Sequence, residues 1–259
     1  MFNEFFFYFP IYFLTIKSIK KGSLNFWRLK MAYKKIKVQG LSKRFGKNMV
    51  LDGLDFDIEG GKIVGLVAPN GSGKTTLLKC LAMLIQPDDG TIEIDGIDAL
   101  SNPSEALKKL SVLIDGPGLF ETMTGKENLE LFASLMKIDR KRLKEIKEYT
   151  KLGTFLRKKV STYSLGMKQR LGLGIALMKR PEIILLDEPM SGLDPGGIMD
   201  LRNELSQLKR TGTAILVSSH QLNELEKFVD RVFFLVNGCL VEGSMRDLEE
   251  EYRQYYGYA

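Results

Sequence analysis

The stretch of sequence that decides the fold is APNGSGKTT, at residues 68–76. It follows the apolar run 63–67 and leads into residues 75–84, where apolar residues recur at helical spacing. A glycine-rich loop between a strand and a helix is the setting of a phosphate-binding loop, because backbone N–H groups and the helix N-terminus surround phosphate oxygens. The residues expected to contact the phosphates are Asn70, Gly71, Ser72, Gly73, Lys74, Thr75 and Thr76.

Three residues of this loop carry specific expectations. Lys74 is placed to supply a cation for the β- and γ-phosphates of a nucleotide, and the Thr75 hydroxyl is suited to hold Mg²⁺. The loop starts with Ala68 where glycine is usual, so its first residue must adopt a conformation that a methyl group allows. A glycine-rich turn without a ligand is the alternative, and the strand–loop–helix order weighs against it.

A second motif, IILLDE at residues 183–188, supplies acids that fit a nucleotide site. Its four apolar residues predict a strand buried on both faces, which ends in two carboxylates. Asp187 is expected to hold Mg²⁺ directly or through water, and Glu188 to orient and deprotonate an attacking water. Such runs are common by themselves, and this one is informative because Lys74 lies 113 positions before Asp187.

Strand and helix patterns alternate along the chain from Tyr33 onward. Strands are predicted at residues 36–38, 51–58, 63–67, 91–94, 183–186 and 214–217. Helices are predicted at residues 75–84, around 129–136 and around 143–146, and a hairpin at Asn237-Gly238. This alternation predicts an α/β fold with a parallel sheet at its core.

The composition excludes several classes of protein. The chain has 259 residues, of which 44% are hydrophobic and 27% charged, unlike a disordered, collagen-like or disulfide-stapled chain. A single histidine rules out a multi-histidine metal site. Cys80 and Cys239 lie in apolar runs, so buried free thiols in a reducing compartment are expected, with a disulfide as the alternative.

Residues 1–30 differ from the rest of the chain in composition. They contain ten of the 25 aromatic residues, with five basic groups and one acid. Of the net charge of +6, this leader carries +4 and the remaining 229 residues carry +2. A basic balance suggests a nucleic-acid or anionic-membrane partner, but the nearly neutral body argues against nucleic acid.

Four interpretations of this leader compete, and the sequence argues against the first two. The apolar run 5–16 is too short for a transmembrane helix and contains Pro10. A signal peptide has its lysines before the apolar stretch, whereas here they follow it. An interfacial anchor fits the Phe, Trp and Lys content. The fourth is that the segment is not translated, because codons for Trp27-Arg28 can form a ribosome-binding sequence just before Met31.

Further motifs resemble the ATP-binding subunits of ABC transporters from about residue 35 to residue 243. The sequence YSLGMKQR at residues 163–170 is similar to the family signature, usually Leu-Ser-Gly-Gly-Gln. The resemblance implies that Ser164 and Gly166 contact the γ-phosphate held by a second subunit, from the start of a helix. Leu165 departs from the pattern, and an ordinary serine N-cap is compatible with this role.

Three more residues match positions of this family. The sequence SGLD at residues 191–194 resembles its D-loop, so Asp194 is expected at the dimer interface. His220 follows an apolar strand, 32 residues after Glu188, and matches the switch histidine that bonds the γ-phosphate and steadies the catalytic carboxylate. Phe45 lies 29 residues before Lys74, where the family stacks an aromatic ring on adenine. Their structural alternatives are a capped turn, a satisfied histidine and core packing.

Asp115 is the largest departure from the family, which usually has glutamine where a loop senses Mg²⁺ and meets the membrane subunit. The acid, together with TGKENL at residues 124–129 and the signature, resembles the bacitracin- and lantibiotic-resistance exporters. A carboxylate still contacts hydrated Mg²⁺ but donates no hydrogen bond. The alternative is a solvated loop acid.

The resemblance implies a P-loop NTPase (RecA-like) core with an antiparallel β subdomain and an inserted α-helical subdomain. The expected organisation is the leader 1–30, an ATP-binding domain 31–245 with a helical subdomain at about 100–165, and a tail 246–259. The implied catalytic residues are Lys74, Glu188 and His220, with ATP and Mg²⁺ as cofactors and Thr75, Asp187 and Asp115 at the metal.

The implied partners are a second ATP-binding subunit, stacked head to tail around two ATP, and a separate transmembrane permease on the cytoplasmic face of the membrane. Hydrolysis would then power export of a drug or antimicrobial peptide. The alternatives are a soluble ABC-type ATPase and a regulatory nucleotide-binding module without transport. The former usually carries two such domains or a long coiled coil, and intact Lys74, Asp187, Glu188 and His220 weigh against the latter.

Overall fold

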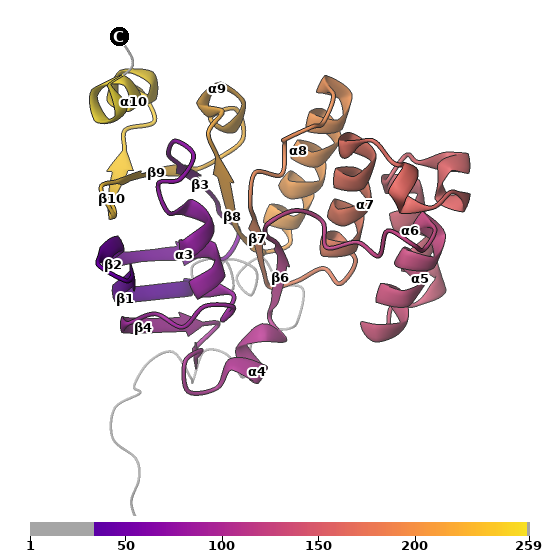
Figure 1. Ribbon diagram of the computed structural model, residues 1–259, viewed down its shortest axis with the longest axis horizontal. Helices are drawn as coiled ribbons and strands as arrows, with labels where there is room; N and C mark the ends of the chain where they lie inside the picture. The colour runs from indigo at the N-terminus through magenta and orange to yellow at the C-terminus, as the bar shows by residue number, and fades with distance from the viewer. Residues whose placement is uncertain (1–33, 258–259) are drawn as a thin grey trace, which may run out of the picture.

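A computed structural model describes residues 34–257 of the chain, in which two β-sheets are combined with helices (Figure 1). A six-stranded sheet forms the centre, in the order β10-β9-β3-β8-β7-β6, and a four-stranded sheet has the order β2-β1-β4-β5. The aromatic and basic leader at residues 1–30 lies outside the described residues.

The central sheet is parallel apart from one edge strand. Neighbours β9-β3-β8-β7-β6 pair in parallel, and β10 pairs antiparallel with β9. Parallel strands buried on both faces are apolar throughout, as β3 and β7 are. The strands are β3 (Ile63–Val67), β6 (Leu110–Leu113), β7 (Ile183–Leu186), β8 (Ala214–Ser219), β9 (Arg231–Val236) and β10 (Cys239–Gly243).

The smaller sheet is antiparallel, and stretches of its strands alternate between buried and less buried residues because one face packs in the core. Ile36, for example, pairs with Ile58 on one side and Ile94 on the other, and all three are fully buried. The alternation is interrupted between Val38 and Leu41, where the pairing of β1 with β2 shifts register. The strands are β1 (Lys34–Phe45), β2 (Asn48–Glu59), β4 (Asp89–Ile94) and β5 (Ile97–Asp98).

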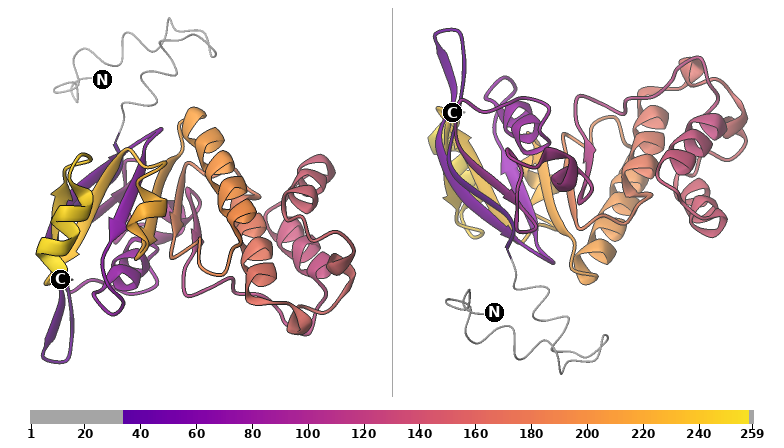
Figure 2. Two further views of the ribbon diagram at one scale, coloured as in Figure 1. Left: turned by 90° about the horizontal axis from the view of Figure 1, so that it is seen from above. Right: turned by 90° about the horizontal axis from the view of Figure 1, so that it is seen from below.

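Two hydrophobic cores cover the two faces of the central sheet. Alternate residues such as Val64 and Leu66 pack with the small sheet and with α3 (Lys74–Leu81). Their neighbours Ile63 and Val67 pack in the other core, with α7 (Leu165–Leu177), α8 (Pro195–Arg210) and α10 (Leu248–Tyr256). The helices α3 and α7 therefore lie on opposite faces of the sheet (Figures 1 and 2).

A helical region connects β6 to β7 and extends to one side of the molecule (Figure 2). Its first helix starts with a capping box, in which the Thr124 hydroxyl accepts from the Glu127 N–H and the Glu127 carboxylate from the Thr124 N–H. The elements of this region are α5 (Gly125–Leu135), α6 (Arg140–Tyr149), the 3₁₀ helices Gly153–Arg157 and Val160–Thr162, and α7. Two short helices, α4 (Pro103–Leu107) and α9 (Leu222–Leu225), lie elsewhere.

This architecture confirms the predicted α/β P-loop fold with its antiparallel sheet and inserted helices. One expectation is wrong: both cysteines are free and Cys80 is buried, but Cys239 is exposed. Cys239 directly follows the Asn237-Gly238 turn and begins the edge strand β10, where its thiol contacts only the Asp52 carbonyl of β2 among the bonds found in residues 34–257. Across residues 34–257, none of the helices combines the length and apolar character that crossing a bilayer requires.

Candidate nucleotide site

The phosphate loop joins the end of β3 to the start of α3. Gly71 and Gly73 have φ of 81° and 107°, which L-residues with side chains rarely adopt. At Gly73 a Cβ atom would also lie 2.9 Å from a Val50 methyl group. Ala68 is fully buried and is absent from the residues with positive φ, so its methyl group is accommodated, as expected.

Lys74 lies beneath the loop and is almost fully buried, at 5% exposure. Its ammonium donates to the carbonyls of Ala68 at 2.6 Å and Pro69 at 3.1 Å. The same Nζ atom lies 3.5 Å from Oε1 of Glu188. A buried cation held by neutral carbonyls and one carboxylate attracts an incoming anion strongly, because little water screens it.

Three oxygen-bearing side chains meet at the carboxyl ends of β7 and β8. The Thr75 hydroxyl donates to Oδ2 of Asp187 at 2.7 Å. The Ser218 hydroxyl donates to the other Asp187 oxygen, Oδ1, and accepts from the Glu188 N–H at 3.0 Å. Ser218 therefore orients both acids, a role that the sequence motifs do not predict. The one feature of the sequence that points to it is a polar residue at the end of an apolar run, and in β8 this residue is fully buried.

The Thr75 hydroxyl and the Asp187 carboxylate fit Mg²⁺, which prefers hard oxygen ligands. Over residues 34–257, no three His, Cys, Asp or Glu side chains cluster into a protein-only metal cage. Mg²⁺ is usually bound by one or two carboxylates together with water and substrate phosphates. The two protein oxygens beside a phosphate loop are consistent with that mode of binding.

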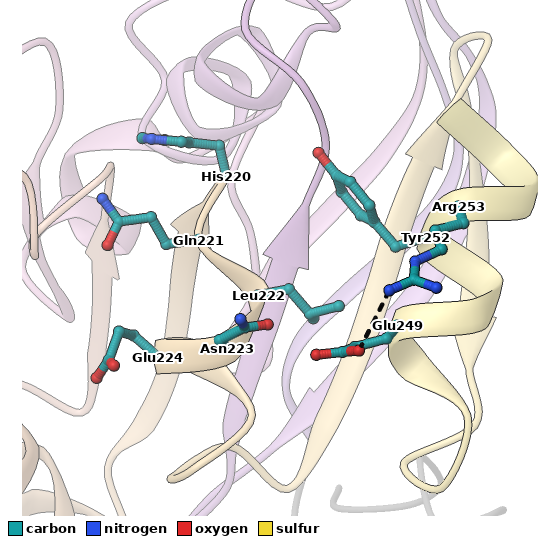
Figure 3. Close-up of a pocket in the computed structure, with 8 residues that line it drawn as sticks. All are labelled: His220, Gln221, Leu222, Asn223, Glu224, Glu249, Tyr252 and Arg253. Carbon is teal, nitrogen blue, oxygen red and sulfur yellow. Dashed lines mark ion pairs between the residues drawn. The ribbon is translucent and has the colours of Figure 1, made fainter. Parts of the chain in front are cut away.

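Glu188 and His220 contact each other across the ends of β7 and β8. Nδ1 of His220 lies 2.8 Å from Oε2 of Glu188. The opposite oxygen, Oε1, is buried and has no hydrogen-bond partner among the described residues. Glu188 itself has φ of 46°, a strained conformation for a residue with a side chain. His220 also borders a hollow of about 480 Å³ between α9 and α10 (Figure 3).

The signature residues pack on the D-loop rather than on the phosphate loop of the same chain. Ser164 caps α7, and its hydroxyl accepts from the Met167 N–H at 3.3 Å. A Cβ atom on Gly166 would lie 2.5 Å from the Gly192 carbonyl, so only glycine permits this approach. Arg170 forms an ion pair with Asp194, and its hydrogen bond holds the pKa of that carboxyl below the usual range.

Phe45 and Asp115 lie at the margins of this cluster. Phe45 is the last residue of β1 and is 49% exposed. The Lys43 ammonium lies 5.4 Å from the centroid of its ring. Asp115 has φ of 57° and forms an ion pair with Lys79 of α3. The structure thus brings Lys74, Thr75, Asp187, Glu188 and His220 together. For Phe45, Ser164, Gly166, Asp194 and Asp115, the contacts found within residues 34–257 are with other groups.

The model of a protein family described as "ABC transporter" matches residues 51–191, more than half of the chain. This chain belongs to the ABC transporter family. The ABC domain resembles the bacitracin transport ATP-binding protein BcrA of Enterococcus faecalis, with 38% identity over 223 residues, which cover 85% of this chain and 72% of BcrA. It is also 33% identical to the lantibiotic transport ATP-binding protein SrtF of Streptococcus pyogenes, over 84% of this chain and 91% of SrtF.

A solved structure also resembles this ABC domain. A dimeric post-hydrolysis state of the ATP-binding cassette MJ0796, bound to ADP and Pi, aligns with a TM-score of 0.74 and 27% identity. The alignment covers 82% of this chain and 99% of MJ0796. The ABC domain described here is an ATP-binding domain and an ATPase.

Proposed function

We propose that this ABC ATPase domain powers the export of antimicrobial peptides or drugs through a separate membrane subunit. Its similarity to BcrA and SrtF, whose names refer to bacitracin and lantibiotic transport, supports this substrate class. The observation that carries coupling to a membrane partner is the ion pair between Asp115 and Lys79. This ion pair connects an apolar groove to α3, the helix that begins at Lys74.

Hydrolysis is assigned to the residues at the ends of β7 and β8. Oε1 of Glu188 accepts no hydrogen bond within residues 34–257 and only faces the Lys74 ammonium at 3.5 Å, so it is assigned to accept a proton from an attacking water. His220 holds the other carboxylate oxygen at 2.8 Å, and is proposed to contact the γ-phosphate as well. Lys74 neutralises the β- and γ-phosphates, and Asn70 to Thr76 bind them through backbone N–H groups. Phe45, exposed at the end of β1, is assigned to adenine stacking.

Mg²⁺ is assigned to Thr75 and Asp187, with Asp115 as an outer contact through water. The ion supplies charge neutralisation at the phosphates when bound. The protein's own contribution is to orient these oxygens, and the Ser218 hydroxyl fixes the Asp187 carboxylate for that purpose. A fixed carboxylate loses less conformational entropy on binding a cation.

Two copies are proposed to stack head to tail around two ATP molecules. Supporting this, α3 and α7 lie on opposite faces of the sheet, and Leu165 and Gly166 pack on Gly192 in the D-loop of their own chain. The N-terminus of α7 offers N–H groups and a favourable dipole to a phosphate on a second copy. MJ0796 is dimeric in its state with ADP and Pi.

The proposed docking surface is an apolar groove of about 460 Å³ along β6. It lies between the end of α3 and the helices α5 and α7, and Ile114 and Gly116 on either side of Asp115 contribute to its lining. Leu84, Leu107 and Val112 line it with 62%, 43% and 37% of their surface exposed. Such a patch on a globular protein typically marks an interaction site. The proposed location is therefore the cytoplasmic face of the membrane.

Co-purification tests this proposal. The chain is co-expressed with a candidate membrane subunit, sought as a neighbouring reading frame with about six apolar segments of roughly 20 residues each, the length of a transmembrane helix. Leu107→Glu, inside the groove, is expected to abolish co-purification while the isolated ATPase stays active. Leu135→Glu is the control, since Leu135 is 69% exposed and lies outside the groove. Equal co-purification of both variants, or failure of the wild-type chain to co-purify with the membrane subunit, contradicts the proposal.

A further inference from the structure

We propose that Tyr256, in the last turn of α10, is a positioning residue for the phosphate loop. The Tyr256 hydroxyl lies 3.2 Å from the Val67 carbonyl and 3.1 Å from the Leu235 carbonyl. Val67 is the last residue of β3 and is followed directly by Ala68, the first residue of the loop. This role concerns nucleotide binding by the isolated chain and is independent of any membrane partner.

The hydroxyl connects β3 and β9, two parallel neighbours, near their carboxyl ends. Its single hydrogen is shared between two acceptors, and both distances exceed those of an ordinary O–H···O bond, as sharing requires. Burial raises the pKa of the Tyr256 hydroxyl, so it remains protonated and keeps its donor. Tyr256 packs against both hydrophobic cores, so its ring contacts the apolar residues on either side of the sheet.

The contact is transmitted to the catalytic lysine through few bonds. The Val67 carbonyl and the Ala68 nitrogen share one planar peptide unit, so holding the oxygen also holds the orientation of Ala68. The Ala68 carbonyl in turn accepts from Nζ of Lys74 at 2.6 Å. A small rotation of the 67–68 peptide plane therefore moves the carbonyl that holds the lysine.

Helix α10 is anchored well enough to hold this position. The Tyr256 ring lies 6.4 Å from the ring of Phe234, which is fully buried, and 4.8 Å from that of Tyr252, centroid to centroid. At the other end, the Glu251 carboxylate accepts from the Ser244 N–H at 3.1 Å. In Figure 3, Tyr252 lies on α10 across the hollow from His220, so α10 and the switch histidine line the same hollow.

The test compares Tyr256→Phe with Tyr255→Phe in the full chain without a partner. Both variants lose one hydroxyl, but no hydrogen bond of the Tyr255 hydroxyl is found within residues 34–257. The dissociation constant for ATP is measured by calorimetry, kcat by phosphate release, and amide exchange by mass spectrometry of peptides covering residues 68–76. The folded fraction of each variant is measured by denaturation, so that the dissociation constant is calculated for folded protein only.

Tyr256→Phe is expected to weaken ATP binding about 3- to 10-fold, the range of one hydrogen bond. It is also expected to speed exchange in residues 68–76 and to lower kcat by a similar factor, because the Ala68 carbonyl that shifts also holds Lys74. Tyr255→Phe should leave all three quantities within about twofold of the wild type. The proposal is overturned if Tyr256→Phe matches Tyr255→Phe in affinity and loop exchange. It is equally overturned if exchange rises only in α10, because Tyr256 then serves packing alone.

Discussion

Nδ1 of His220 lies 2.8 Å from Oε2 of Glu188, and this contact crosses from the end of β8 to the end of β7. The other Glu188 oxygen faces the Lys74 ammonium at 3.5 Å. The carboxylate is thus held between an imidazole and an ammonium, while the Ser218 hydroxyl accepts a hydrogen bond from the backbone N–H of Glu188. A fixed carboxylate of this kind is suited to orient one water molecule, since its own reorganisation during the reaction is small.

Glu188→Gln should separate ATP binding from ATP hydrolysis. The amide keeps the size of the side chain but cannot take up a proton, so turnover is expected to fall roughly 10²- to 10⁴-fold. ATP affinity should stay within about threefold, because Glu188 is assigned to the water rather than to the phosphates. Phosphate release and equilibrium binding measure the two effects. The exposed Glu226→Gln is the control, and turnover of Glu188→Gln within tenfold of the wild type would argue against the assignment.

Ser218→Ala should weaken both the site and the fold. The change leaves a buried oxygen of Asp187 and the Glu188 N–H without their shared partner, at a cost of about 1–3 kcal/mol. We expect about tenfold slower turnover and a lower denaturation midpoint. Ser219→Ala is a matched control on the same strand, because the buried Ser219 hydroxyl accepts only from the Gln221 N–H among the bonds found in residues 34–257. Equal turnover of the two variants would remove Ser218 from the site.

Thr75→Val should raise the Mg²⁺ requirement of hydrolysis. Valine keeps the shape of threonine but removes the hydroxyl that lies 2.7 Å from Asp187. The Mg²⁺ concentration at half-maximal rate is expected to increase about tenfold, and EDTA should stop turnover in the wild type. Thr91→Val, on the exposed side of β4, provides the control. An unchanged Mg²⁺ titration would show that Thr75 does not contact the ion.

Asp115→Ala is expected to uncouple hydrolysis from transport. The substitution breaks the ion pair with Lys79 between the groove and α3, so the isolated ATPase should keep most of its activity while cells lose resistance. Lys79→Met breaks the same pair from the other side and should produce the same defect. Glu148→Ala breaks an exposed ion pair with Lys144 on α6 and should have no effect. Unchanged resistance in Asp115→Ala would refute the coupling role.

The two cysteines should differ in reactivity in the native protein. Burial raises the pKa of Cys80 to about 11, so at pH 8 roughly a thousandth of this thiol is ionised. Cys239 is exposed and should react with iodoacetamide first. Mass spectrometry of the native chain is expected to find one modified thiol, and two after unfolding. Modification of Cys80 should accelerate about tenfold per pH unit up to pH 11, whereas equal initial rates would contradict its burial.

Part of the site could be predicted because it is encoded by adjacent residues. The φ values of 81° at Gly71 and 107° at Gly73 strongly favour glycine, and the apolar run 183–186 is stable where both faces of its strand are buried. The exposure of Cys239 could not be predicted in this way, since an apolar run does not reveal that its strand lies at the edge of the sheet.

The sequence by itself determined the phosphate loop, the buried strands and the acids that follow them, because these depend on local spacing and backbone conformation. Only the tertiary structure decided that Ser218 bridges Asp187 and Glu188, that Asp115 pairs with Lys79, and that a hydroxyl from α10 reaches Val67. These contacts join segments between 30 and 189 positions apart. They depend on the order of strands in the sheet and on which helix covers each face, and no local pattern specifies either.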